Sequence, residues 1–244
     1  QGSYVIDNSS AFRLHEEVPL VVYGINQNEI TSTTKLIANP NCTTMGLVMA
    51  LKPLHDKFSL VSMTPVAYQA VSGSGSEAVS SLRKEESLDD KSLAELKDGY
   101  YTRPIARNVI PLAGNLLDNG YSDEEMKFVH ESKKILGIPE LVVEPSNARV
   151  GVRTGHGVFC SAVFEKNINT DEAIDELNNF EGVQYWSETL ATPLDAENNY
   201  DVLVSRLRIG LSSPKIINFW CVSDNLLKGA ALNAVQIAKY LIQK

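Results

Sequence analysis

Short runs of β-branched and apolar residues alternate along this chain with longer segments of helical periodicity. The strand-like runs cover residues 4–7, 19–23, 36–38, 58–71, 140–152, 158–165, 202–209 and 215–222. The helical patterns cover residues 43–51, 76–97, 122–136, 170–180 and 224–242. Several strand-like runs follow one another without a helix between them, as antiparallel neighbours do. This order predicts an α+β fold, with a mixed or antiparallel sheet covered by helices, rather than a simple doubly wound sheet.

Two of the expected helices have clear local start signals. Ser122 and Glu125 have the spacing of a capping box, in which each side chain satisfies a backbone N–H at the start of a helix. The sequence Asn-Pro-Asn at residues 39–41 ends the short strand 36–38, and a helical pattern follows directly. Cys42 is therefore expected at a strand-to-helix turn.

The chain lacks a dinucleotide-binding fingerprint. No GxGxxG motif follows a predicted strand, although such a turn is what lets a Rossmann domain approach a pyrophosphate. The opening runs at 4–7 and 19–23 instead resemble two strands of a sheet whose remainder is not in this chain. We therefore expect the chain to begin in the middle of a domain.

Composition excludes several classes of function. The formal net charge is −8 and no cluster of Lys and Arg is present, which argues against nucleic-acid binding. No apolar run approaches the roughly 18 residues of a membrane span, and the N-terminus does not resemble a signal peptide, so a cytoplasmic protein is expected. Three widely spaced cysteines indicate neither a disulfide framework nor a zinc site.

Cys42 is the candidate nucleophile. A cysteine at the start of a helix feels the positive end of the helix dipole and free N–H groups, and both favour the thiolate. The alternative is that Cys42 is a small buried apolar residue, as many free cysteines are. Cys160 and Cys221 lie within apolar strand-like runs, so we expect them in the core.

A thiolate that attacks an acyl group needs a partner for proton transfer, and the chain has four histidines. His55 and His130 fall on helices among charged residues, and His15 falls in a polar turn, so surface positions are expected. His156 lies between two glycines in a predicted turn between strands, where a side chain can face a cleft. His156 is the candidate acid/base, although a histidine in a turn is more often structural.

Five motifs, in order and with matching spacing, resemble those of aspartate-semialdehyde dehydrogenases. They are VIDNSSAFR at 5–13, NPNCTT at 39–44, YQAVSGSG at 68–75, RVGVRTGH at 149–156 and GAALNAVQ at 229–236. The resemblance runs from residue 4 to the end of the chain. It implies the C-terminal domain of the glyceraldehyde-3-phosphate-dehydrogenase-like fold together with remnants of a Rossmann domain.

The resemblance also implies roles for individual residues. Cys42 would form an acyl-thioester, His156 would act as acid/base, and Gln69 would orient the substrate or its thioester. The substrate-binding residues would be Arg149 for a carboxylate, Glu124 for an amino group, and Arg13 and Lys127 for phosphate. The cofactor-binding residues would be Ser72, Gly73 and Gly75 beside the nicotinamide of NADP, and Asn233 at its amide.

Each of these residues also has a purely structural interpretation. Glu124 and Lys127 are three apart on a helix and would ordinarily form a surface ion pair. Arg149 could belong to a salt bridge, residues 72–75 could be a plain turn, and Asn233 could bond to a neighbouring loop. Their joint occurrence in family order favours the functional interpretation.

The sequence departs from the family in two respects. Family members usually have Cys before the substrate arginine and Pro after the Arg-Val pair, where this chain has Ala148 and Gly151. The larger departure is that a Rossmann half, on the order of 100 residues, is expected to be missing. We therefore expect residues 1–40 to be the tail of the NADP-binding domain, 41–222 the catalytic and dimerisation domain, and 223–244 a helix that packs on the NADP-binding domain. A chain of this kind should bind NADP weakly and be inactive alone.

The expected reaction is NADPH-dependent reduction of L-aspartyl 4-phosphate to L-aspartate 4-semialdehyde, with release of phosphate, in lysine, threonine and methionine biosynthesis. Three alternatives remain open: a reductase of N-acetylglutamyl phosphate, a cysteine hydrolase built on Cys42 and His156, and a catalytically silent dimerisation and substrate module. By family analogy we expect a homodimer or tetramer that associates through the substrate-domain sheet, with neither nucleic acid nor membrane as a partner.

Overall fold

The computed structural model describes residues 3–243, and within them eight strands form one mixed sheet. The strands are β3 (Leu60–Gln69), β4 (Val109–Ile110), β5 (Val142–Val143), β6 (Ser146–Val150), β7 (His156–Phe164), β8 (Val183–Trp186), β9 (Val202–Ile209) and β10 (Ile216–Ser223). Their order is β4-β6-β3-β7-β10-β9-β8, and β5 also pairs with β3. The central pairs β3–β7, β7–β10 and β10–β9 are antiparallel, whereas β3–β6 and β8–β9 are parallel. The predicted α+β class with a mixed sheet is confirmed.

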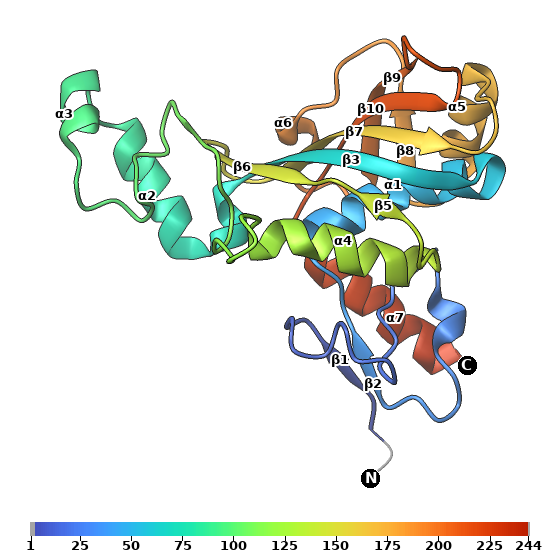
Figure 1. Ribbon diagram of the computed structural model, residues 1–244. Coiled ribbons are helices and arrows are strands. Elements are labelled where there is room, and N and C mark those ends of the chain that lie inside the picture. Colours follow the sequence, from blue (N-terminus) through green and yellow to red (C-terminus); the bar gives the residue numbers. More distant parts are fainter. Residues whose placement is uncertain (1–2, 244) are drawn as a thin grey trace.

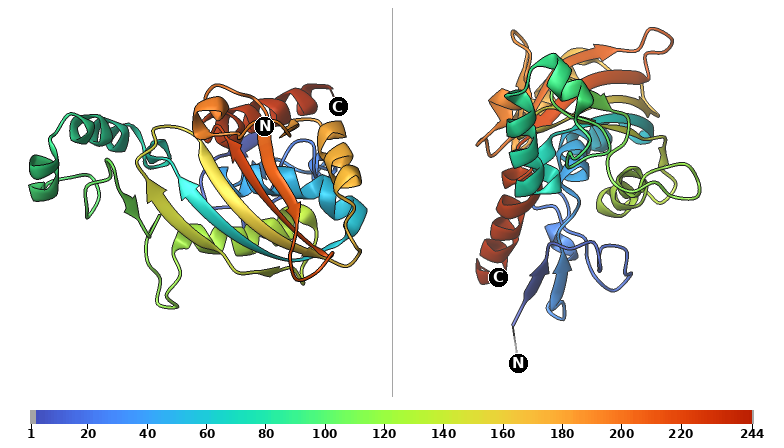
Figure 2. Two further views of the ribbon diagram at one scale, coloured as in Figure 1. Left: turned by 90° about the horizontal axis from the view of Figure 1, so that it is seen from above. Right: turned by 90° about the vertical axis from the view of Figure 1, so that its left-hand side faces the viewer.

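One face of this sheet is covered by helices α1 (Cys42–Phe58), α4 (Asp123–Leu136) and α5 (Thr170–Asn179) (Figure 1). The main core lies between the sheet and these helices, where Leu47 and Leu51 of α1 join Phe164 and Phe219 of the strands. In the left view of Figure 2 the strands lie in front of α1 and α4, and only the short helix α6 (Pro193–Ala196) lies near the open face. No helix among the described residues is long and apolar enough to cross a membrane.

A second, smaller layer lies on the other side of α1 and α4, away from the main sheet (Figure 1). Strands β1 (Val5–Asp7) and β2 (Leu36–Ala38) pair in parallel, and a 3-10 turn, η1 (Gln27–Glu29), lies between them in the sequence. A π-helix, η3 (Leu227–Ala231), leads into α7 (Leu232–Gln243), whose Ile237 packs against this layer. The helix predicted over residues 224–242 therefore begins three residues later, at Leu227, and its first part is a π-helix, which is wider than an α-helix.

Helices α2 (Ser76–Glu86) and α3 (Asp90–Glu95) project from the body as an arm (Figures 1 and 2). The sequence predicts one helix over 76–97, but the chain breaks before Asp89, whose side chain caps α3 by accepting from Ser92 N. Glu85, in the last turn of α2, is buried and accepts hydrogen bonds from the backbone N–H groups of Ile105 and Ala106. The break arises because Asp89 offers a good N-cap in the middle of the pattern.

Some expected strands differ from the structure. Residues 19–23 form no strand beyond a single bridge at Leu20, because the Asn26 and Asn233 side chains accept the N–H groups of Val22 and Tyr23 that a neighbouring strand would have used. The run 140–152 divides into β5 and β6 at Pro145, which has no N–H to donate. Strands β4 and β8 and helix α6 were not predicted, since each is too short for its period to be visible.

The capping box at Ser122 is present and fixes the start of α4. Ser122 Oγ accepts from Glu125 N at 3.1 Å, and the Glu125 carboxylate accepts from Ser122 N at 2.7 Å. The same hydroxyl is fully buried and accepts a second hydrogen bond, from Asn147 Nδ2 of β6, at 2.8 Å. A single hydroxyl therefore ties the first turn of α4 to the sheet.

We expect Ser122→Ala to lower the free energy of unfolding by about 1–2 kcal/mol, because the helix loses its cap and Asn147 loses a buried acceptor. Urea denaturation measures this change. Ser80→Ala, on the exposed face of α2, is the control and should change stability little. Equal effects of the two substitutions would contradict the assigned role of the Ser122 hydroxyl.

Candidate active site

Cys42 is the first residue of α1 and directly follows the turn after β2, as the sequence predicts. Asn41 is the N-cap, and its Oδ1 accepts from Thr43 N at 3.0 Å and Thr44 N at 3.2 Å. Gly229 of η3 lies so close that a Cβ there would stand 2.7 Å from Cys42 Cβ. The thiol is thus held between a capped helix start and the π-helix, and it is half-buried.

Helix α4 presents three charged side chains to this turn. Glu124, Lys127 and Glu131 share one face because their spacing of three and four residues matches the helical repeat. Glu124 accepts from Asn41 Nδ2 at 3.0 Å and pairs with Lys127, while Glu131 accepts from the Asn41 backbone N at 2.7 Å. Both carboxylates therefore hold the residue that precedes Cys42.

Glu131 is a residue of the site that sequence reasoning missed. It is 2% exposed, and besides Asn41 it binds Arg13 Nη1 at 3.0 Å. Burial raises the pKa of Glu131, and Arg13 opposes this shift. The sequence does contain a sign of it: Glu131 follows Lys127 by one helical turn and so lies on the same face of α4 as Glu124 and Lys127.

His156 is buried, and it begins β7 instead of lying in the preceding turn. Its Nδ1 accepts from Ala70 N at 3.0 Å, so the neutral ring carries its proton on Nε2. That Nε2 is buried and has no hydrogen-bond partner in the described part of the chain. Burial, and secondly the nearby Arg149 guanidinium, lower the pKa of His156 to about 3. In this arrangement the imidazole is neutral and offers a free donor.

Gly73 lies against both His156 and Arg149. A Cβ at this position would stand 2.9 Å from His156 Nε2 and 3.3 Å from Arg149 Nη1, so any side chain would have to displace them. Arg149 Nη1 donates to Ala70 O at 2.8 Å, and Arg149 Nε is buried without a hydrogen-bond partner among residues 3–243. The Ala70 peptide thus orients both the imidazole and the guanidinium.

A cavity of about 340 Å³ brings most of the predicted residues together. Nine of them line it: Arg13, Cys42, Gln69, Ser72, Gly73, Glu124, Lys127, Arg149 and His156. Asn225 also lines it, and its Oδ1 accepts from Ser72 Oγ and from Gly155 N, which joins the Ser72 loop to the turn before His156. The sequence analysis did not single out Asn225.

Gly75 and Asn233 do not line this cavity. Gly75 follows at the end of the loop with φ +98° and open space around it. Asn233 is fully buried, and its side chain bonds to Val21 O, Tyr23 N and Asn39 Oδ1. The hydrogen bonds of Asn233 match the structural interpretation, in which it holds a neighbouring loop, and its contact with a cofactor stays a prediction.

The remaining cysteines and histidines lie away from the cavity. Cys160 and Cys221 are buried in β7 and β10, as expected. His15 and His130 are exposed, but His55 is half-buried and its Nδ1 accepts from Leu60 N, so the surface position predicted for it is wrong. This correction removes no candidate from the site.

The two departures from the family pattern lie on or beside β6. Gly151 follows its last residue, and a Cβ there would stand 2.7 Å from Ile105 O. The backbone at 105 therefore occupies the space that a side chain at 151 would need. Ala148 lies within the strand itself and pairs with Tyr68 of β3.

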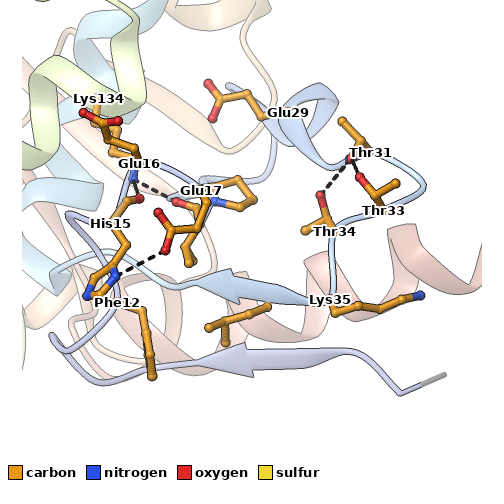
Figure 3. A pocket seen from close by; sticks show the side chains of 13 residues that line it. Phe12, His15, Glu16, Glu17, Glu29, Thr31, Thr33, Thr34, Lys35 and Lys134 are labelled. Atoms are coloured by element: carbon orange, nitrogen blue, oxygen red, sulfur yellow. Dashed lines mark hydrogen bonds and ion pairs between the residues drawn. The ribbon is translucent and has the colours of Figure 1, made fainter. Parts of the chain in front are cut away.

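A larger hollow, of about 660 Å³, lies beside β2 (Figure 3). It contains none of the predicted residues. Its Lys134 donates to the carbonyl oxygens of Arg13, His15 and Val18, so this cation is already used in holding the loop. The hollow therefore offers no free cation from Lys134 to a ligand.

The charge state of Cys42 differs from the one that its helix position predicts. Burial, and secondly the Glu124 carboxylate, raise the pKa of the Cys42 thiol to about 11. The helix start does favour the thiolate, but a carboxylate on the neighbouring helix opposes it. Cys42 is a neutral thiol in this arrangement.

We expect the thiolate absorbance of Cys42, measured as wild type minus Cys42→Ser, to titrate near pH 11. In Glu124→Gln the midpoint should fall, because a negative charge that disfavours the thiolate is removed. Asp56→Asn, on the far end of α1, is the control and should leave the midpoint in place. An unchanged midpoint in Glu124→Gln would contradict the inferred effect of Glu124.

The depressed pKa of His156 makes stability depend on pH. The unfolded chain protonates this residue below its ordinary pKa of about 6.5, whereas the folded chain keeps it neutral down to about 3. Stability should therefore fall as the pH falls from 6.5 to 3, because the unfolded state binds the extra proton. His156→Asn should show a shallower decrease in urea titrations over this range, and an equal slope in both proteins would contradict the prediction.

Comparison with known proteins identifies the family. Residues 51–228 match the semialdehyde dehydrogenase dimerisation domain. The aspartate-semialdehyde dehydrogenase of Corynebacterium glutamicum is 43% identical over 99% of this chain and 74% of its own length.

Solved structures give the same result. Aspartate semialdehyde dehydrogenase II of Vibrio cholerae, crystallised in complex with ASA, superposes with a TM-score of 0.92 and 35% identity over 98% of this chain and 72% of its own. The Candida albicans enzyme, solved with NADP, shares the fold at a TM-score of 0.74 and 24% identity, over 98% of this chain and 70% of its own. This chain belongs to the aspartate-semialdehyde dehydrogenase family.

Proposed function

We propose that this protein catalyses the NADPH-dependent reduction of L-aspartyl 4-phosphate to L-aspartate 4-semialdehyde, with release of phosphate, in the biosynthesis of lysine, threonine and methionine. The proposal rests on the set of residues that line the cavity. A thiol at Cys42 and an imidazole at His156 line it together with three cations, Arg13, Lys127 and Arg149. An acyl phosphate with a free carboxylate requires a nucleophile and such positive charges.

Acyl transfer is the first step of the proposed mechanism. Cys42 Sγ bonds to the carbonyl carbon, the bond from that carbon to the phosphate oxygen breaks, and the thiol proton leaves with the phosphate. Arg13 and Lys127 stabilise the leaving anion. Because its Nε2 carries a proton, His156 donates to the substrate oxygen as negative charge develops there.

Reduction follows at the same carbon. NADPH, when bound, supplies the hydride that reduces the thioester. Ser72, Gly73 and Gly75 would hold its nicotinamide, and Gly73 suits this role since it brings bare backbone close to His156. His156 then passes a proton taken up from solvent to the oxygen of the resulting thiohemiacetal, and collapse of this adduct to the aldehyde transfers that proton to sulfur and restores the Cys42 thiol.

Two charged side chains would fix the amino-acid end. Arg149 has an unpartnered Nε, which suits a carboxylate ligand. Glu124 would take the ammonium group and Gln69 would orient the acyl group. A carboxylate at the amino end favours an ammonium over an acetamide, so an N-acetylglutamyl phosphate is the weaker substrate candidate.

The domain assignment is part of the same proposal. Residues 41–222 would carry catalysis and dimerisation, while 1–40 and 223–244 would adjoin the NADP-binding part. The small layer of β1, β2 and α7 stands apart from the main sheet, which supports this division.

The acyl-transfer step provides a test that needs no NADP. L-Aspartyl 4-phosphate should release one equivalent of phosphate per site and leave an aspartyl group on Cys42, located by mass spectrometry of the peptide. Cys42→Ser should release none, and Cys160→Ser should behave as wild type. Phosphate release without a Cys42 adduct would favour a hydrolase, and no reaction would favour a catalytically silent module.

We also propose a homodimer that forms through the open face of the sheet. Tyr68, Phe159 and Trp220 are half-buried and in ring contact there, and Leu190 and Leu194 beside them are 65% and 79% exposed. Exposed apolar side chains gathered in this way are typical of protein–protein interfaces. Light scattering should give twice the chain mass at micromolar concentration, and Trp220→Glu should shift it toward the monomer. A monomeric wild type would refute the proposal.

A further inference from the structure

Each cation that would bind phosphate is already paired with a carboxylate on α4. Lys127 Nζ donates to Glu124, and Arg13 Nη1 donates to Glu131. Two positive and two negative charges therefore cancel at this end of the cavity. An anion that enters alone meets no net positive field from these four groups.

The two ion pairs differ in how easily a ligand can open them. Glu131 is 2% exposed and Arg13 is 8% exposed, and Glu131 also holds the backbone of Asn41. Separating this pair would leave a buried charge unpaired, which costs several kcal/mol. The side chains of Glu124 and Lys127 are 17% and 24% exposed and both line the cavity. Partly solvated pairs three residues apart are worth about 0.2–0.5 kcal/mol.

Within the Glu124–Lys127 pair, one partner is anchored and the other is not. The second carboxylate oxygen of Glu124 accepts hydrogen bonds from Asn41 Nδ2 at 3.0 Å and from Gln69 Nε2 at 3.4 Å. Lys127 Nζ makes no hydrogen bond to the described residues other than the one to Glu124. If the pair opens, Glu124 stays in place and the flexible Lys127 side chain moves.

We propose that the substrate ammonium replaces Lys127 at Glu124, and that the released Lys127 then binds the phosphate of the same substrate. This inference rests on the proposed function and adds a coupling between its two ends. The ammonium and the phosphate bind cooperatively, since each favours the state with the pair open. A compound that lacks the ammonium leaves Lys127 bound to Glu124. The phosphate of such a compound therefore binds more weakly than that of a substrate with an amino group.

Inorganic phosphate and L-2-aminobutyrate test the coupling directly. L-2-Aminobutyrate carries the ammonium and carboxylate but no reactive carbonyl, and butyrate lacks only the ammonium. Calorimetric titration with phosphate should give a Kd lowered about 1.4- to 2.3-fold by saturating L-2-aminobutyrate, because opening a pair worth about 0.2–0.5 kcal/mol supplies no larger coupling. Butyrate should leave the Kd unchanged.

Substitutions assign the effect to the pair. Glu124→Gln should bind phosphate more tightly than wild type without any analogue, because Lys127 is already free, and L-2-aminobutyrate should add nothing. Asp56→Asn removes the ion pair with Lys52 on the surface of α1 and is the matched control. It should retain the full effect of the analogue.

Equal phosphate affinity with L-2-aminobutyrate and with butyrate in wild type would overturn the inference, whatever the variants do. If Cys42 is nevertheless acylated by aspartyl phosphate, the proposed function stands without the coupling. Absence of phosphate binding under every condition would overturn the phosphate assignment of Arg13 and Lys127, and the inference with it.

Discussion

The hydrogen bond from the Asn41 backbone to the buried Glu131 carboxylate joins the two halves of the active site. It fixes the residue before Cys42 to α4, and the same carboxylate holds Arg13. Helix α4 is in turn fixed to the sheet through Ser122 and its contact with Asn147. The position of the nucleophile relative to its charged neighbours therefore depends on a short chain of buried polar contacts, each of which is costly to leave unpaired.

Most ionisable groups of the cavity are either neutral or paired with an opposite charge. Cys42 is a neutral thiol, and His156 is a neutral imidazole whose Nδ1 is taken by the Ala70 N–H. Lys127 and Arg13 are paired with carboxylates. In the proposed exchange, the substrate supplies the ammonium and the phosphate that would open the Glu124–Lys127 pair.

Elements with strong local signals could be predicted from the sequence. The start of α1 after Asn41 and the capping box at Ser122 depend on side chains within three or four residues of the backbone groups they satisfy. Residues 19–23 could not be predicted correctly, because their N–H groups bond to side chains such as Asn233, more than 200 positions away. The short strands β4 and β8 are strands only because longer neighbours pair with them.

The same distinction applies to the site. Most candidate residues from the motifs meet in one cavity, which the resemblance implied. Glu131 was missed because its meaning lies in a contact with Asn41, 90 positions away. The helix position of Cys42, which favours the thiolate, is visible in the sequence, but its burial and the proximity of Glu124, which raise the pKa of the thiol, are not.

The protonated state of Cys42 bears on its oxidation. Peroxides oxidise thiolates far faster than thiols. Burial, and secondly the Glu124 carboxylate, raise the pKa of this thiol to about 11, so a smaller fraction of it is thiolate than in an exposed cysteine. The surroundings that keep Cys42 protonated therefore also make it a poorer target for peroxides than an exposed cysteine.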